Sequence, residues 1–253
     1  MLRLNTRANR IILWGPALLS TLWSAGPAHS QVMTYRITLE NLTNSAPNSG
    51  QPFSPPVFFT HDGSLTLWTP GETASDPLRQ IAEEGNNAPL LTDLSLAGSA
   101  VGTIRVLSGP QMPGTSQTFS IATDLSTHRF LSNVWMLGRT NDGFAGQASL
   151  DLNGISSTPV SFDLLGLDAG TEVNNELAAF LPSLGGPFND PENGVVGLHG
   201  GIAGTADAPA SWNFTGPVAR LTIVAAAAPE PSTVFLAITG VLLAAGLRRR
   251  HQA

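Results

Sequence analysis

Residues 142–172 read DGFAGQASLDLNGISSTPVSFDLLGLDAGTE, and this stretch decides how the chain is expected to fold. From Phe144 to Leu152 every second residue is apolar or small, and the alternation returns from Val160 to Leu164. Alternation with a period of two is typical of a half-buried β-strand. Asn153-Gly154 lies between the two runs, and Asn-Gly is a strong hairpin signal. The stretch therefore predicts a β-hairpin.

Acidic residues flank this predicted hairpin. Because the two outer ends of a hairpin lie at the same edge of a sheet, Asp142 and Asp168 should be neighbours, with Glu172 on the adjoining glycine-containing loop. Three carboxylates at one place repel one another strongly, and the chain has no lysine to neutralise them. Calcium takes about six to eight oxygen ligands. We therefore expect Asp142, Asp168 and Glu172 to be calcium ligands.

A plainer interpretation of these residues stays open. Asn141-Asp142-Gly143 is also an ordinary turn sequence. Asp168 or Thr171 could cap a helix that runs from Val173 to Phe180. In either case the acidic residues would shape the backbone and bind no metal.

The rest of the central chain favours strands over helices. Gly (26) and Pro (19) are abundant, which suits turns between strands. Two helical segments are expected, one opened by Asp76-Pro77 and stopped by Gly85, and a short turn from Pro89 to Leu94. Further strands are expected at residues 33–41, 57–60, 101–107, 118–123, 130–137 and 218–224.

Charge and composition exclude several kinds of partner and site. Between Gln31 and Leu247 the chain carries six arginines against all 18 acidic residues, a net charge of −12. Such a surface repels phosphate backbones, so nucleic acid is not an expected partner. The absence of cysteine excludes disulfides and thiolate metal sites.

The first 30 residues have the order of a secretory signal peptide. A basic start leads into an apolar stretch from Ile11 to Trp23, and then to a small-residue site at Ala28-His29-Ser30. Export requires this order of basic, apolar and small residues. A buried helix is the alternative, but Gly15-Pro16 would break it. We expect cleavage before Gln31.

Residues 226–253 are expected to be a second sorting signal. Pro229-Glu230-Pro231-Ser232 precedes an apolar run at 234–247, and three arginines follow. This order resembles the PEP-CTERM signal, which implies a Gram-negative envelope and removal of the tail by an exosortase-type membrane protease. The run is short for a hydrocarbon core about 30 Å thick, and the arginines keep their end cytoplasmic. We expect export with transient inner-membrane anchoring; a plain transmembrane anchor is the alternative.

Motifs spread over residues 33–225 together resemble a spondin domain. They are Gly50–Pro56, His61-Asp62, Gly71–Ser75, Ile81–Asn86, Thr140–Phe144 and Asp168–Glu172. The resemblance implies an antiparallel sandwich similar to calcium-and-lipid-binding sandwiches, with a calcium site at Asp142, and at Asp168 with Glu172. Animal members occur in extracellular-matrix adhesion proteins, so the resemblance also implies an adhesion role.

The sequence departs from the animal form of this domain in two ways. Gly143 stands where an aromatic residue usually follows the aspartate, and the cysteines are missing. The first difference leaves the local loop shape open, and the second means that the fold relies on packing alone. For residues 31–225 we predict an all-β, antiparallel β-sandwich of the spondin type with one or two short helices.

Enzyme motifs are largely absent from the chain. It contains no G-x-S-x-G elbow, HExxH zinc motif, phosphate-binding loop or EF-hand loop. His61-Asp62 is a candidate acid–base pair, although a loop pair is the preferred interpretation. Trp68, Trp135 and Trp212 could stack on sugar rings if exposed, but such residues are usually core. We therefore do not expect this protein to be an enzyme.

The expected function is therefore that of an exported calcium-binding β-sandwich. It would act as an adhesion or matrix component of the cell envelope or exopolysaccharide layer. Its expected partners are calcium, an exosortase-type processing protease, and exopolysaccharide or another cell-surface protein. The alternatives are a secreted hydrolase acting on polysaccharide and a metal-independent structural coat protein.

Overall fold

The computed structural model describes residues 32–226. The expected signal peptide at 1–30 and the apolar run at 234–247 lie outside the described residues, as does the Pro-Glu-Pro-Ser tetrad. Within residues 32–226 no helix is long and apolar enough to cross a membrane.

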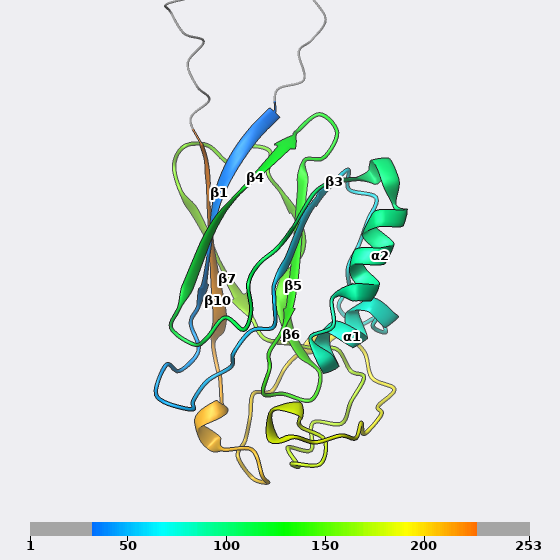
Figure 1. Cartoon of the computed structure of the whole chain (residues 1–253), viewed down its shortest axis with the longest axis vertical. Helices are drawn as coiled ribbons and strands as arrows, with labels where there is room; N and C mark the ends of the chain where they lie inside the picture. The colour runs from blue at the N-terminus through cyan, green and yellow to red at the C-terminus, as the bar shows by residue number, and fades with distance from the viewer. Residues whose placement is uncertain (1–31, 227–253) are drawn as a thin grey trace, which may run out of the picture. The chain divides into compact units, whose positions relative to one another are not determined.

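Two antiparallel sheets pack face to face (Figure 1). One has the strand order β4 (Ser116–Asp124), β1 (Val32–Asn41), β10 (Pro217–Ala225) and β7 (Val160–Leu165). The other has the order β3 (Val101–Val106), β2 (Val57–His61), β5 (Phe130–Met136), β6 (Gly143–Asp151), β8 (Leu167–Asp168) and β9 (Gly197–Leu198). The predicted all-β antiparallel sandwich is confirmed.

The main core lies between the sheets and follows from the alternation seen in the sequence. In β1, Tyr35, Ile37 and Leu39 are fully buried, while the residues between them face outward. They join the same apolar cluster as Phe58 and Trp135, whose rings are stacked with centroids 6.3 Å apart. Burying apolar area on this scale is the dominant stabilising contribution to folding.

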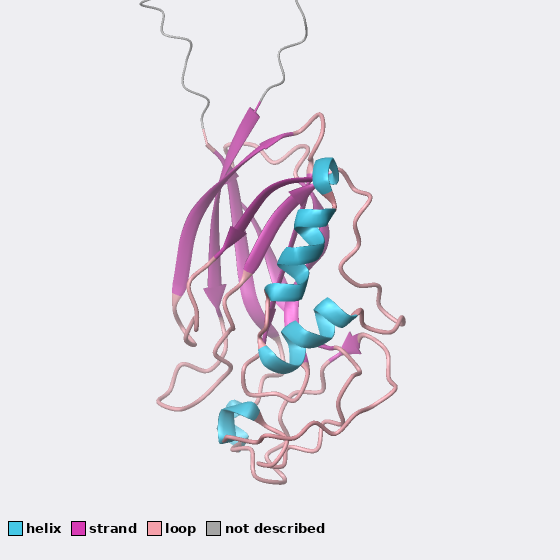
Figure 2. Ribbon diagram, turned by 45° about the vertical axis from the view of Figure 1, so that its right-hand side comes forward, coloured by secondary structure: helices cyan, strands magenta, loops and turns pink. Residues whose placement is uncertain are grey.

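Two helices cover the outer face of the six-stranded sheet (Figure 2). Helix α1 (Asp76–Glu84) begins after Ser75, whose hydroxyl accepts from the Leu78 amide, and ends at Gly85 in the left-handed conformation. Helix α2 (Ala88–Leu96) is a full nine-residue helix where the sequence predicted a turn. Leucine and isoleucine side chains of both helices pack on this sheet and form a second apolar layer.

The predicted hairpin around Asn153-Gly154 is wrong. Strands β6 and β7 belong to different sheets, because β6 pairs with β5 and β8 whereas β7 pairs with β10. Residues 152–159 carry the chain from one sheet to the other. The alternation in both strands was interpreted correctly, but each strand faces its core as part of a separate layer.

Short 3₁₀ turns and long loops complete the structure. The turns are η1 (Gly98–Ala100), η2 (Pro182–Leu184) and η3 (Ala210–Trp212). The segment from Val173 to Phe180 is irregular, so the alternative helix is not present there. The loops of residues 169–216 gather at the end of the sandwich opposite to the start of β1 and the end of β10 (Figure 1).

The three tryptophans considered for sugar stacking are buried. Trp135 is fully inaccessible, and Trp68 and Trp212 are 9% and 6% exposed. The Trp212 indole nitrogen donates to the carbonyl of Asn48 at 2.9 Å, and the Arg139 guanidinium lies over its ring at 4.8 Å. These residues therefore hold the core and the loop end of the sandwich together, and offer no sugar platform.

Candidate metal site

Backbone pairing between β6 and β8 brings Asp142 and Asp168 together. Gly143 is the ladder partner of Asp168, and the Ala169 amide donates to the Asp142 carbonyl at 3.2 Å. The predicted neighbourhood of the two aspartates is therefore present, although it arises from a different pairing. After β7 leaves the four-stranded sheet, the chain turns at Gly166 and returns to the six-stranded sheet as β8.

The two carboxylate oxygens of Asp142 have different surroundings. The side chain is fully buried. Its Oδ2 accepts from the Thr171 amide at 2.7 Å, the Thr171 hydroxyl at 3.2 Å and the Glu172 amide at 3.0 Å. Its Oδ1 is buried and has no hydrogen-bond partner within the described residues. Three donors thus fix the carboxylate so that one oxygen is left for another ligand.

The pKa of Asp142 is raised to about 6. Burial is the main cause and the nearby charge of Asp168 the second, and both outweigh the hydrogen bonds from Glu172 and Thr171, which lower the pKa. The direction is that expected for a carboxylate removed from water beside a second negative charge. Its ionised form therefore lacks a compensating positive charge.

Asp168 is half-buried at the start of the loop that carries Thr171. Its Oδ1 accepts from the Gly170 amide at 2.6 Å, and its Oδ2 accepts from the side-chain amide of Asn174. On its other side it pairs with Gly197 of β9. The Gly197–Gly201 stretch thus begins beside the acidic pair.

Glu172 is buried on the same loop but has a further acidic neighbour. Its side chain is 3% exposed. Its pKa is raised to about 7, mainly by burial and then by the charges of Glu83, Asp142 and Asp190. The Glu83 carboxylate of α1 forms an ion pair with Arg79 at 2.8 Å and accepts a hydrogen bond from the side-chain amide of Asn189 at 3.0 Å. Glu172 therefore lies between the aspartate pair and the end of helix α1.

Of the three predicted ligands, Asp142 is charge-coupled to Asp168, and Glu172 is charge-coupled to Asp142 and to Glu83. Over residues 32–226, no group of three acidic or histidine side chains is arranged so that it could hold a metal ion by itself. The structure instead reveals Asn141, which the sequence interpretation used only as part of a turn. Its Oδ1 is buried and has no hydrogen-bond partner in this part of the chain. In the sequence, its position directly before Asp142 was the feature that could have identified it as a candidate ligand.

Gly170 lets the loop of Asp168 approach a neighbouring segment. It has φ of +67°, in the left-handed region, and an added Cβ would meet the Val195 amide nitrogen at 2.5 Å. The Gly194 amide also donates to the Gly170 carbonyl at 2.8 Å. Glycine is needed here both for conformation and for space.

Glu176 closes the loop end nearby with its side chain. Its carboxylate accepts from the backbone amides of Ala203, Gly204 and Thr205, and its carbonyl accepts from Asp207 and Ala208. This buried carboxylate ties the 173–177 segment to the 203–208 segment. Its role is structural, and it supports the loops that carry Asp168 and Glu172.

His61 and Asp62 do not form an acid–base pair. Asp62 Oδ1 accepts from the Ser64 amide and hydroxyl, at 2.8 and 2.6 Å. His61 is fully buried; its Nδ1 accepts from the Gly63 amide and its Nε2 lies 2.9 Å from the Ser132 hydroxyl. Because that hydroxyl also donates to the Ala148 carbonyl, Nε2 must carry the proton and cannot accept one from the serine.

Comparisons with known proteins agree with this architecture. The Spondin_N family model matches residues 33–177, more than half of the chain. Spondin-2 of Rattus norvegicus is 33% identical over 116 residues, and spondin-2 of Homo sapiens is 31% identical over 116 residues. Each match covers 44% of this chain and 35% of the relative, so the chain spans about a third of the length of these curated relatives. This chain belongs to the Spondin_N family.

Proposed function

We propose that this protein is an exported calcium-binding module that acts in adhesion or as a matrix component of the cell envelope or exopolysaccharide layer. One observation carries the calcium part. Asp142 Oδ1 is buried and without a hydrogen-bond partner among residues 32–226, next to a second carboxylate, Asp168. A buried carboxylate left in this state is costly, and a cation bound there would offset the cost.

The proposed ligands are Asp142 and Asp168, with Glu172 as the third carboxylate. Because these three do not suffice by themselves, the rest of the shell has to come from neutral oxygens. Asn141 Oδ1 is a suitable protein oxygen, since it is buried and unpartnered in the described region. Main-chain carbonyls and water commonly complete such shells.

The donor set favours calcium over other metals. Every proposed donor is an oxygen, and the chain has no cysteine. Carboxylate, carbonyl and water ligands suit calcium and magnesium, whereas zinc and copper sites use sulfur and imidazole nitrogen. Calcium accepts irregular shells of mixed carboxylate and carbonyl oxygens, whereas magnesium requires nearly ideal octahedral geometry.

An adhesion or matrix role follows from the family and from the position of the site. The matched relatives are spondin-2 proteins. The acidic pair lies where long loops gather, and loops at one end of a sandwich commonly carry recognition. Bound calcium would fix the loops of Asp142 and Asp168 and so order this face for exopolysaccharide or another surface protein. Export, with exosortase-type processing of the tail, remains part of the proposal.

The first test measures thermal stability with calcium and with chelator. A ligand present at about a hundredfold excess over its Kd adds about 2.7 kcal/mol to the free energy of unfolding. We expect a clear rise in Tm when CaCl₂ replaces EDTA. Identical Tm values under the two conditions would remove calcium from the function.

The second test assigns the site. Asp168→Asn should lose most of the calcium-dependent rise in Tm, because it removes one charged ligand. Glu192→Gln is the matched control, since it removes one exposed carboxylate from the same loop region and should keep the full rise. A normal calcium response in Asp168→Asn would refute the ligand assignment. Mass spectrometry of both termini of the protein from its native host tests export and tail removal separately.

A further inference from the structure

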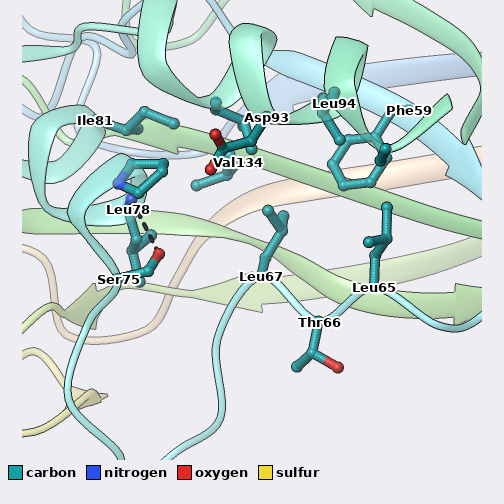
Figure 3. A pocket seen from close by; sticks show the side chains of 13 residues that line it. Phe59, Leu65, Thr66, Leu67, Ser75, Leu78, Ile81, Asp93, Leu94 and Val134 are labelled. Atoms are coloured by element: carbon teal, nitrogen blue, oxygen red, sulfur yellow. Dashed lines mark hydrogen bonds between the residues drawn. The ribbon is translucent and has the colours of Figure 1, made fainter.

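A cavity separate from the acidic pair lies beneath the two helices. It is bounded by the outer face of the six-stranded sheet, by α1 and α2, and by the segment between β2 and α1 (Figure 3). Its volume is about 220 Å³. For comparison, an engineered apolar cavity of about 150 Å³ holds a benzene molecule. By proportion, this cavity has room for a ligand of about eight or nine heavy atoms.

Most of the cavity wall is aliphatic or aromatic. Phe59 and Val134 form the floor on the sheet, and Leu78, Ile81, Leu90 and Leu94 come from the helices. Leu65 and Leu67 reach in from the segment between β2 and α1 (Figure 3). Such walls favour an apolar chain, because each buried CH₂ group gains free energy on leaving water.

One charged group faces this apolar space. Asp93, on α2, lines the cavity but is exposed to solvent, so its carboxylate lies at the open side of the cavity (Figure 3). Its side chain has no ion pair or hydrogen bond within residues 32–226. The two other polar lining residues are Ser75 and Thr66. The Ser75 hydroxyl already accepts a hydrogen bond from the Leu78 amide at 3.5 Å. Among residues 32–226, Asp93 is thus the only ionisable residue that lines the cavity.

We propose that this cavity binds a small aliphatic amine, with the alkyl chain between the helices and the sheet and the ammonium group on Asp93. A single carboxylate at an otherwise apolar wall matches a ligand with one positive charge and a short apolar chain. The surplus of acidic residues over this part of the chain also attracts cations and repels fatty acids. The proposal does not depend on calcium.

The test compares hexylamine with 1-hexanol, which has the same chain length but no charge. Titration of the full chain by calorimetry, with EDTA present, should give a Kd for hexylamine that is about threefold lower than for hexanol. This ratio follows from the modest contribution of a solvent-exposed ion pair. Equal affinities for the two compounds would contradict the amine assignment, and no binding of either would contradict the site.

Two variants separate the head group from the tail. Asp93→Asn should weaken hexylamine to the affinity of hexanol and leave hexanol unchanged. Glu84→Gln is the control, because it removes an exposed carboxylate of the adjacent helix that does not line the cavity. It should keep the preference for the amine. Loss of the preference in both variants would indicate general attraction by negative charge and would overturn the role of Asp93.

A third variant tests whether the ligand enters the cavity. Ala97 lines it at the end of α2, and Ala97→Leu should fill part of the space and weaken both compounds. Its circular dichroism and Tm report whether the fold is retained. Unchanged binding in a folded Ala97→Leu variant would place the ligand elsewhere and refute the proposal.

Discussion

Asp142 shows how a single side chain can hold a loop and prepare a site at once. Oδ2 fixes the 171–172 backbone through its three donors, which leaves Oδ1 buried and unpartnered in the described structure. An asparagine could keep the shape of this arrangement but would carry no charge. The charge of Asp142 strengthens the three hydrogen bonds to Oδ2, and a cation at Oδ1 would offset the cost of burying that charge.

The raised pKa of Asp142 predicts an inverse dependence of stability on pH. Its pKa is about 6 in the folded protein and about 3.9 in an unfolded chain. The folded state therefore holds more protons between about pH 4 and 6, and metal-free stability falls as the pH rises through this window. Two pKa units correspond to about 3 kcal/mol. Urea unfolding in EDTA, from pH 4.5 to 8, measures the decrease.

Asp142→Asn separates this effect from the other acidic groups. The variant should lose the part of the decrease that Asp142 causes up to pH 6 and be more stable than the natural protein at pH 8 in EDTA. A decrease of comparable size should remain between about pH 4.5 and 7, because the pKa of Glu172 is raised from 4.5 to about 7. Equal pH profiles for the variant and the natural protein would show that Asp142 is not the group responsible.

Sequence reasoning reached part of the site at the scale of single residues. The aspartates were found because acidic motifs, a glycine loop and the lack of lysine are visible in one dimension. Glu83 was not connected with Glu172, because it lies on α1, 89 positions earlier, and only the packing of α1 against the loop brings their charges together. Asn141 was missed because its unpartnered oxygen is a property of three-dimensional packing.

At the scale of elements, the main error concerned strand partners. The alternation correctly identified β6 and β7 as strands, and Asn153-Gly154 does form a turn. A two-residue hairpin, however, resumes its second strand at once, whereas β7 begins only at Val160. The five residues after the turn were the signal for a crossing between sheets. By contrast, α1 was predicted correctly because its start and stop are encoded locally by Asp76-Pro77 and Gly85.

The contact of two loops at Gly170 gives a prediction at this scale. Gly170→Ala forces a left-handed residue to carry a Cβ against Val195, and should destabilise by about 3 kcal/mol. Gly154→Ala is the matched control, since Gly154 also has positive φ but no atom within 4 Å of an added Cβ. It should cost about 1 kcal/mol. Chemical denaturation in EDTA compares the two, and equal costs would contradict the importance of loop packing.

At the scale of the molecule, residues 32–226 form three layers around two large apolar clusters, and a small third cluster lies around Leu181, Ile202 and Trp212. One large cluster lies between the sheets and the other large cluster between the six-stranded sheet and the helices. The family match ends at residue 177, but β10 lies beyond it, between β1 and β7. The described domain therefore needs segments on both sides of that limit. The overall class was predictable because alternation and turn residues recur throughout the chain, whereas the sheet order depends on long-range pairing.

The net charge outside the two ends predicts a response to salt that differs from the response to calcium. Eleven excess negative charges in residues 32–226 repel one another in the folded state, and salt at 0.15 M screens charges beyond about 8 Å. NaCl should therefore raise the Tm of the EDTA-treated protein modestly, and by the same amount in Asp168→Asn.

Calcium at 1 mM, a concentration at which general screening is small, should add a further rise that only the natural protein shows. Magnesium at the same concentration is the control for charge, because its demand for octahedral geometry does not suit this site. Equal effects of magnesium and calcium, or equal effects of calcium on both proteins, would reduce the acidic pair to one contribution among many to a negative surface.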